Sequence, residues 1–293
     1  MADGILLLDK PQGFTSFDVI AKLRGMSRQR KIGHAGTLDP MATGVLPCLF
    51  GSATRLCDVM PCEEKTYFST VQFGISTDTQ DITGEVLSKS DLAIDKTMIE
   101  AVLPAFRGEI TQIPPMYSAV SVNGKRLYDL ARQGKEIERP GRQITIHDLT
   151  LVSFDATQRR ADFSVTCSKG SYVRTLFHDI GQTLGCGAAL SALKRTASSG
   201  FALDDCITMD KAQRLTDEGM LLDRLLPVSA AFATLPRFEV GEWQGKMLSN
   251  GVALSLKKLG NPEPGQYAVW QSEVFLGLGT IDPDSDGMRL KRF

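Results

Sequence analysis

The sequence predicts a strand-rich fold that also contains short helices, followed by a small β-rich module. Residues 65–73 alternate between apolar and polar side chains and are rich in β-formers, which predicts a half-buried strand. Asp95 is suited to cap a short helix with apolar residues at helical spacing. Residues 227–236 dilute both patterns, so we place a domain boundary there.

In the first half of the chain, short strands and short helices are separated by turn residues. Ser16 is a good N-cap for the first helix, and Gly25 is expected to end it. Strands are expected at residues 5–8, 45–50, 65–73, 84–87 and 118–122, and helices at 16–25, 52–60 and 95–104.

In the second half, Asn123-Gly124 predicts a tight turn that leads into a short helix at 127–131, closed at Gly134. Further strands are expected at 145–154, 161–167 and 200–203, and helices at 172–184, 189–194, 209–216 and 220–226. The last sixty or so residues carry β-type runs at 267–270, 274–278 and 288–290 between Gly and Pro turns.

The composition is that of an ordinary soluble globular protein, with 42% hydrophobic and 23% charged residues in 293. The first apolar run, residues 5–8, is too short for a signal peptide or a membrane span, and no later run approaches membrane length. We therefore expect no membrane association and a cytoplasmic location. The six cysteines form no CxxC pair and the three histidines show no metal-type spacing with them, which predicts free thiols and no metal site.

The segment from Gly33 to Gly44 is the least periodic stretch of the chain and contains one carboxylate, Asp39. Pro40 restricts the residue before it to extended or turn conformations, and three glycines permit tight backbone geometry. This composition predicts a rigid loop that displays Asp39. On this segment alone, a plain Asp-Pro turn between two elements is the slightly favoured interpretation.

Basic residues are clustered although the net charge is only −1. One cluster directly precedes the glycine-rich segment and consists of Lys22, Arg24, Arg28, Arg30 and Lys31. A second occupies an excursion at about 115–142, which includes Arg126 and Arg132. Each cluster is either a solvated face or a contact surface for phosphates.

Several common mechanisms lack their motifs, because the chain contains no GxGxxG, no GxxxxGK, no HExxH and no GxSxG. A carboxylate can act at a sugar C1′, as glycosidases show, but hydrolysis usually requires a second carboxylate as the acid. No obvious partner acid accompanies Asp39 in the sequence.

Six motifs together resemble the TruB family of bacterial tRNA pseudouridine synthases, which isomerise the uridine at position 55 in the T loop. They are LLLDKPQGFTS at 6–16, GHAGTLDP at 33–40, KTY at 65–67, PPMYSA at 114–119, YVRT at 172–175 and LKRT at 193–196. They cover most of residues 5–203 in order, and six motifs in one order are far more specific than any one alone.

The resemblance implies an α+β fold, with a mixed, mostly antiparallel sheet of pseudouridine synthase type and flanking helices. The strand-rich pattern is compatible with this fold but does not by itself choose its topology. The resemblance also implies a catalytic domain at 1–232, with an RNA-gripping arm at about 115–142, and a PUA-like RNA-binding domain at 233–293. No residue of that second domain is assigned a role.

The resemblance also implies roles for individual residues. Asp39 is the expected catalytic carboxylate, Tyr67 stacks on the target base and helps to remove the C5 proton, and Arg174 pairs with Asp39. His34 is expected to brace the space left by the flipped nucleotide, and Tyr172 and Leu193 to form the pocket wall. The basic residues of both clusters would contact T-arm phosphates.

The expected partner is therefore the T arm of tRNA, and the reaction requires no cofactor and no metal because nothing is oxidised, reduced or hydrolysed. We expect a monomer. Two other functions stay open: a tRNA-binding or folding chaperone with secondary or no catalysis, and a glycoside-type hydrolase. Release of free uracil would support the hydrolase.

Overall fold

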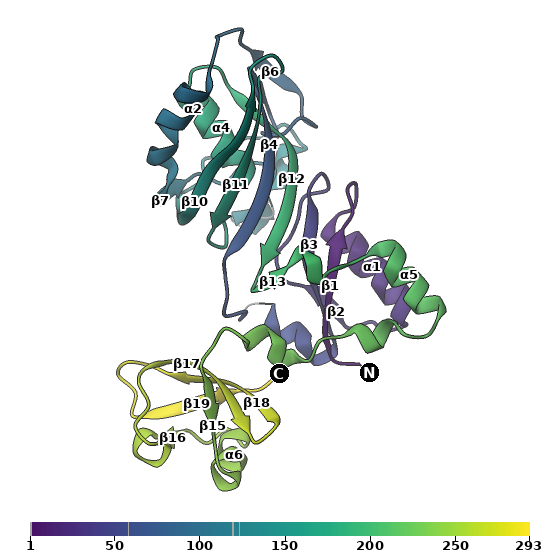
Figure 1. The fold of residues 1–293 in the computed structure, drawn as a ribbon, viewed down its shortest axis with the longest axis vertical. Coiled ribbons are helices and arrows are strands. Elements are labelled where there is room, and N and C mark those ends of the chain that lie inside the picture. Colours follow the sequence, from purple (N-terminus) through teal and green to yellow (C-terminus); the bar gives the residue numbers. More distant parts are fainter. Residues whose placement is uncertain (1, 58, 119, 123) are drawn as a thin grey trace.

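The structure is a computed structural model that describes residues 2–57, 59–118, 120–122 and 124–293. Its centre is a ten-stranded sheet, and a separate five-stranded sheet lies near the C-terminus (Figure 1). Along the main path of the large sheet, the strands are β14 (Ile207–Thr208), β1 (Gly4–Lys10), β3 (Thr43–Phe50), β12 (Ala188–Ser198), β4 (Lys65–Phe73), β11 (Arg160–Cys167), β10 (Arg142–Asp155) and β7 (Gly108–Gln112).

Two short strands complete the large sheet: β2 (Ile32–His34) pairs with β3, and β13 (Phe201–Ala202) pairs with β12. Most neighbours are antiparallel, but β1 with β14 and β3 with β12 are parallel. The sheet is thus mixed and mostly antiparallel, as the resemblance implied.

Two pairs of helices flank the large sheet, and α6 lies beside the small one (Figure 1). Figure 1 shows α1 and α5 beside β1, and α2 and α4 beside the strands at the other end. The helices are α1 (Ser16–Ser27), α2 (Lys96–Val102), α3 (Leu127–Ala131), α4 (Val173–Thr183), α5 (Met209–Asp217) and α6 (Glu242–Ser249). Phe177 and Ile180 of α4 are fully buried against Phe163 of β11, which anchors α4 to the sheet.

The helix termini agree with the sequence pattern in one case and differ in another. Asp95 caps α2 as predicted, accepting a hydrogen bond from the Met98 amide. The cap of α1 is Thr15 rather than Ser16, because Thr15 forms a capping box with Asp18. Gly25 does not end α1, which continues to Ser27 and stops where Arg28 adopts a left-handed conformation with φ 53°.

The prediction of a helix at residues 189–194 is wrong, because this segment belongs to β12. β12 lies between β3 and β4 and pairs with both, so its backbone groups are satisfied by neighbours far away in the sequence. Such pairing overrides local propensity. As a consequence, Leu193 and Arg195 point to the same face of the sheet, which a helix would not allow.

Smaller differences concern short elements. The predicted helix at 52–60 is a 3₁₀ helix at Gly51–Leu56, and the one at 220–226 is a 3₁₀ turn at Leu221–Arg224. The strand predicted at 84–87 is β6 (Val86–Lys89), which pairs with β5 (Ile75–Thr77). The predicted turn at Asn123-Gly124 includes a residue outside the described part of the chain, as does Ala119 of the PPMYSA motif.

The strand predicted at 118–122 is described only as β8 (Ser121–Val122), which pairs with β9 (Lys125–Arg126). The helix predicted at 127–131 is confirmed as α3. In the described part of the chain, no helix has the length and apolar character needed to cross a membrane.

The C-terminal sheet comprises β15 (Arg237–Glu239), β17 (Gly265–Gln271), β18 (Val274–Ile281), β19 (Gly287–Lys291) and β16 (Leu254–Ser255), in that order. This confirms a small β-rich module after residue 233, whose likeness to a PUA domain stays a prediction. Phe232 packs against Phe275 and Phe293, with ring centroids 5.2 Å from each. The proposed boundary at 232/233 therefore passes through a shared apolar cluster.

Candidate active site

The Asp39 loop, residues 35–42, joins β2 to β3 and is tied to α1 and to the turn before it. The Ser16 hydroxyl accepts a hydrogen bond from the Leu38 amide (2.9 Å) and donates one to the Leu38 carbonyl (3.2 Å). The Gly13 amide donates to the Pro40 carbonyl at 2.8 Å. Asp39 therefore lies in a braced loop, whereas His34, expected in the same loop, ends strand β2.

Lys10 is a buried residue that binds the Asp39 loop at Pro40. Its side chain is fully buried, and its ammonium donates to the carbonyls of Phe14, Pro11 (3.0 Å) and Pro40 (3.5 Å). Burial lowers the pKa of Lys10 to about 8, partly offset by the nearby Asp39 carboxylate.

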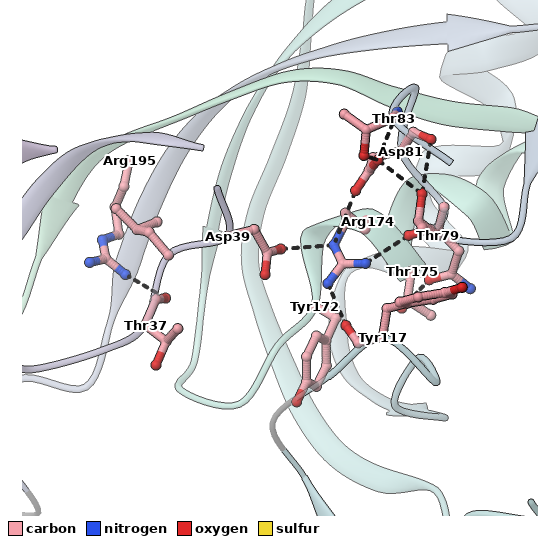
Figure 2. Close-up of polar contacts among 12 residues, drawn as sticks. Thr37, Asp39, Thr79, Asp81, Thr83, Tyr117, Tyr172, Arg174, Thr175 and Arg195 are labelled. Atoms are coloured by element: carbon pink, nitrogen blue, oxygen red, sulfur yellow. Dashed lines mark hydrogen bonds and ion pairs between the residues drawn. The ribbon is translucent and has the colours of Figure 1, made fainter. Parts of the chain in front are cut away.

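Arg174 connects Asp39 to two other loops. Its Nε donates to Asp39 Oδ2 at 2.8 Å, its Nη1 to the Thr79 carbonyl at 2.7 Å and its Nη2 to the Tyr117 carbonyl at 2.9 Å (Figure 2). The Arg174 side chain is only 5% exposed, whereas the Asp39 side chain is 40% exposed. The buried guanidinium thus orients the carboxylate and leaves it accessible to a ligand.

Asp81 is a second carboxylate at this site, and the sequence analysis missed it. Its Oδ1 accepts hydrogen bonds from the hydroxyls of Thr79 and Thr83 and from the Thr83 amide, and its Oδ2 lies 3.9 Å from Arg174 Nε (Figure 2). The spacing of Thr79, Asp81 and Thr83 within a polar loop was the available signal. The Asp81 side chain is only 7% exposed and lies beside Arg174, which it supports.

A cavity of about 240 Å³ opens at the Asp39 carboxylate. Five of the six residues with predicted catalytic or pocket roles line it: Asp39, Tyr67, Tyr172, Arg174 and Leu193. They come from the Asp39 loop, β4, the turn before α4, α4 and β12, so only the tertiary fold brings them together. Tyr172 is held by Gln112, whose side-chain amide bonds both its backbone amide (2.8 Å) and its carbonyl (3.1 Å).

His34 lies outside this cavity and lines a larger adjoining groove of about 940 Å³, which also includes Asp39 and Arg174. Burial lowers the pKa of His34, so the ring favours the neutral form. Burial likewise raises the pKa of Tyr67, an effect opposed by the neighbouring Arg195 charge. Both rings therefore present uncharged surfaces.

The predicted phosphate-binding residues fall into three groups. Arg126 and Arg132 are exposed, flank the Tyr128 ring at 5.9 and 5.5 Å, and line the larger groove. Lys22, Arg28, Arg30 and Lys31 are exposed but do not line that groove. Arg24 is half-buried and donates to the Ile32 carbonyl at 2.9 Å, so it ties α1 to β2.

Residues 24–173 match the family model for the N-terminal domain of TruB family pseudouridylate synthases, and residues 174–233 match the model for the C-terminal domain of tRNA pseudouridylate synthase B. The tRNA pseudouridine synthase B of Bacillus licheniformis is 43% identical over 285 residues, which cover 96% of this chain and 90% of that protein. The chain belongs to the TruB family of pseudouridylate synthases.

Membership of the TruB family makes the chain an enzyme of the isomerase class. The tRNA pseudouridine synthase B of Bacillus subtilis is also 43% identical, over 87% of this chain and 84% of that protein. The fold extends further: a chain in the crystal structure of a Cbf5-Nop10-Gar1 complex superposes with a TM-score of 0.76 over 99% of this chain and 84% of its own length, at 24% identity.

Among the described residues, no group of three or more His, Cys, Asp or Glu side chains is arranged to hold a metal ion.

Proposed function

We propose that this TruB-family enzyme isomerises uridine 55 in the T loop of tRNA to pseudouridine, with Asp39 as the catalytic carboxylate. The observation that carries the proposal is the Asp39–Arg174 ion pair, 2.8 Å long, at the mouth of a cavity that Tyr67 and Tyr172 also line. The names of the curated relatives support tRNA as the substrate.

The reaction exchanges one bond to the ribose for another. The N1–C1′ bond breaks, the uracil turns, C5 bonds to C1′, the C5 proton leaves and N1 gains a proton. Asp39 either attacks C1′ or assists the departure of the base. Tyr67 lies within the same cavity, where it can pack against the uracil and help to remove the C5 proton.

A uridine within a folded loop must leave its stack to enter a cavity of this size. Leu193 and Tyr172 supply the walls that hold the extruded base by packing. His34 lines the adjoining groove beside Asp39, where a neutral ring can fill the space that the base leaves. Arg126 and Arg132 flank the same groove and would contact the RNA backbone.

The buried position of Asp81 disfavours the hydrolase. Retaining and inverting glycosidases need two carboxyl groups that both reach the scissile bond. Asp81 instead makes its hydrogen bonds with Thr79 and Thr83, is only 7% exposed, and lines the adjoining groove but not the cavity. Asp39 is thus the one accessible carboxylate among the residues that line the cavity.

The test is the variant Asp39→Asn, which keeps the shape of the side chain and removes its charge. We expect it to abolish pseudouridine formation in a T-arm transcript while RNA affinity changes by only a small factor. Asp148→Asn, at an exposed position on β10, is the matched control and should retain full activity.

Normal activity of Asp39→Asn would overturn the mechanism. Release of free uracil by the wild-type enzyme would favour hydrolysis. Unchanged ability to refold denatured tRNA in the inactive variant would show that a chaperone function exists independently of catalysis.

A further inference from the structure

Arg195 is an unusual cation, because it is one of the two bulkiest fully buried side chains and carries its charge without an acidic partner. Among the described residues, no carboxylate lies within ion-pair distance of its guanidinium. An isolated buried charge is costly unless its donors are satisfied. The Arg195 guanidinium instead donates hydrogen bonds to backbone carbonyls.

All three carbonyls belong to the Asp39 loop or to the strand that follows it. Nε donates to the Val45 carbonyl at 2.8 Å, Nη2 to the Gly36 carbonyl at 3.0 Å and Nη1 to the Thr37 carbonyl at 3.4 Å. Figure 2 shows the bond to Thr37 on the side of Asp39 opposite Arg174. One planar group therefore grips the backbone on both sides of the catalytic residue.

The position of Arg195 is set by strand register. It lies opposite Tyr67 of β4 and beside Gly44 of β3. Gly44 has φ 103°, and a Cβ there would come within 2.1 Å of the Arg195 carbonyl oxygen, so only glycine permits this approach. Leu193, two residues earlier on the same face, lines the cavity. β12 thus presents a pocket wall and, next to it, the support of the loop.

We propose that Arg195 is a positioning residue: its guanidinium holds the backbone of residues 36–45 so that Asp39 meets Arg174 and the cavity in one geometry. The proposal rests on the proposed catalytic role of Asp39. Arg174 binds the Asp39 carboxylate directly, whereas Arg195 binds the main chain of residues on either side of Asp39. The charge of Arg195 also contributes, after burial, to the lowered pKa values of His34 and Lys65.

The test compares Arg195→Lys with Arg159→Lys. Lysine keeps the charge but is shorter and lacks the planar fork. Arg159 is a matched control, because its guanidinium also donates to backbone carbonyls of a loop, those of Ser90 and Leu92, away from the cavity. Three quantities are measured: the single-turnover rate at saturating T-arm transcript, the Kd of that transcript, and amide hydrogen exchange.

We expect Arg195→Lys to lower the single-turnover rate by about 100-fold, as for a small displacement of a catalytic group, while the Kd changes less than about threefold. Amide exchange should accelerate at residues 36–45. Arg159→Lys should keep the wild-type rate and accelerate exchange only near residues 90–92.

An unchanged rate, equal losses in rate and affinity, or faster exchange throughout the protein would each overturn the proposal. If Arg195→Lys does not fold, Arg195→Gln is measured in the same way, and unfolding of both variants would show that Arg195 serves the fold and not the loop. Wild-type activity of Asp39→Asn would refute the proposed function, whereas the exchange result would still report whether Arg195 holds the loop.

Discussion

Two buried cations, Lys10 and Arg195, both donate hydrogen bonds to the backbone of the Asp39 loop. Each is fully buried, and each binds backbone carbonyls. Cations held this way cost free energy when they are desolvated, and they persist where the geometry they impose is required. The loop that carries Asp39, and with it the Asp39–Arg174 ion pair, is thus held by two further cations through its backbone.

The lowered pKa of Lys10 predicts a specific pH dependence of stability. In the folded protein this pKa is about 8, whereas the ordinary value is 10.5. Between these values the unfolded chain binds a proton that the folded chain does not, so Lys10 makes the free energy of unfolding increase with pH, by at most about 1.4 kcal/mol per unit. Denaturant titrations from pH 7 to 10.5 measure this slope.

Lys10→Met should remove this contribution, so that its free energy of unfolding rises less with pH than that of the wild-type protein. Lys211→Met, on the exposed side of α5, is the control and should keep the wild-type slope. Identical slopes for Lys10→Met and wild type would mean that Lys10 stays protonated in the fold.

At the scale of elements, the two basic clusters relate differently to the cavity. The arm places Arg126 and Arg132 at the groove that contains Asp39. The N-terminus of α1 borders the same groove through Ser16 and Phe17, but Arg28 follows its last residue, twelve residues further along. A twelve-residue helix is about 18 Å long, so Arg28 and Arg30 would contact RNA well away from the target nucleotide.

The double variant Arg126→Gln, Arg132→Gln should weaken binding of a T-arm transcript. The slope of log K against the logarithm of the salt concentration should become less steep by about one to two. Filter binding at several salt concentrations gives the slope. Arg28→Gln, Arg30→Gln is the matched pair at the end of α1, for which we also expect a reduced slope.

An unchanged slope in either pair would identify that cluster as a solvated face. Arg24→Gln should behave differently from both. Arg24 donates a hydrogen bond to the Ile32 carbonyl, so its replacement should lower the free energy of unfolding.

At the scale of the whole molecule, the C-terminal module shares an apolar cluster with the large sheet. Ile5, Leu7 and Val45 of the large sheet belong to the same cluster as Ala268 and Leu278 of the small one. Figure 1 shows the module at one end of the large sheet, near the N-terminus. Continuous packing of this kind couples the unfolding of two domains more tightly than a polar interface does.

We expect the full chain to unfold in one cooperative calorimetric transition. Phe275→Ala removes a ring that packs on both Phe232 and Trp270, and should separate the unfolding of the module from that of the rest. Phe238→Ala, which removes a ring packed on Tyr267 inside the module, should lower the transition temperature without splitting it. Two transitions in the wild-type protein would contradict the coupling.

Local composition was sufficient to predict features that depend on neighbouring residues. The alternation of residues 65–73 predicted strand β4 with its bounds, Asp95 predicted the cap of α2, and the Gly and Pro spacing predicted a constrained loop around Asp39. These features follow from backbone sterics, capping and pleat, which act within a few residues. The motifs, in their order, indicated the family.

Only the tertiary structure decided which distant residues meet. Asp81 supports Arg174 from a loop more than ninety residues away in the sequence, and β12 is a strand because β3 and β4 flank it. Arg195 supports the Asp39 loop for the same reason, since strand register determines which side chains lie opposite one another. The sequence alone therefore determined where the proposed catalytic carboxylate lies, and long-range pairing determined what holds it in place.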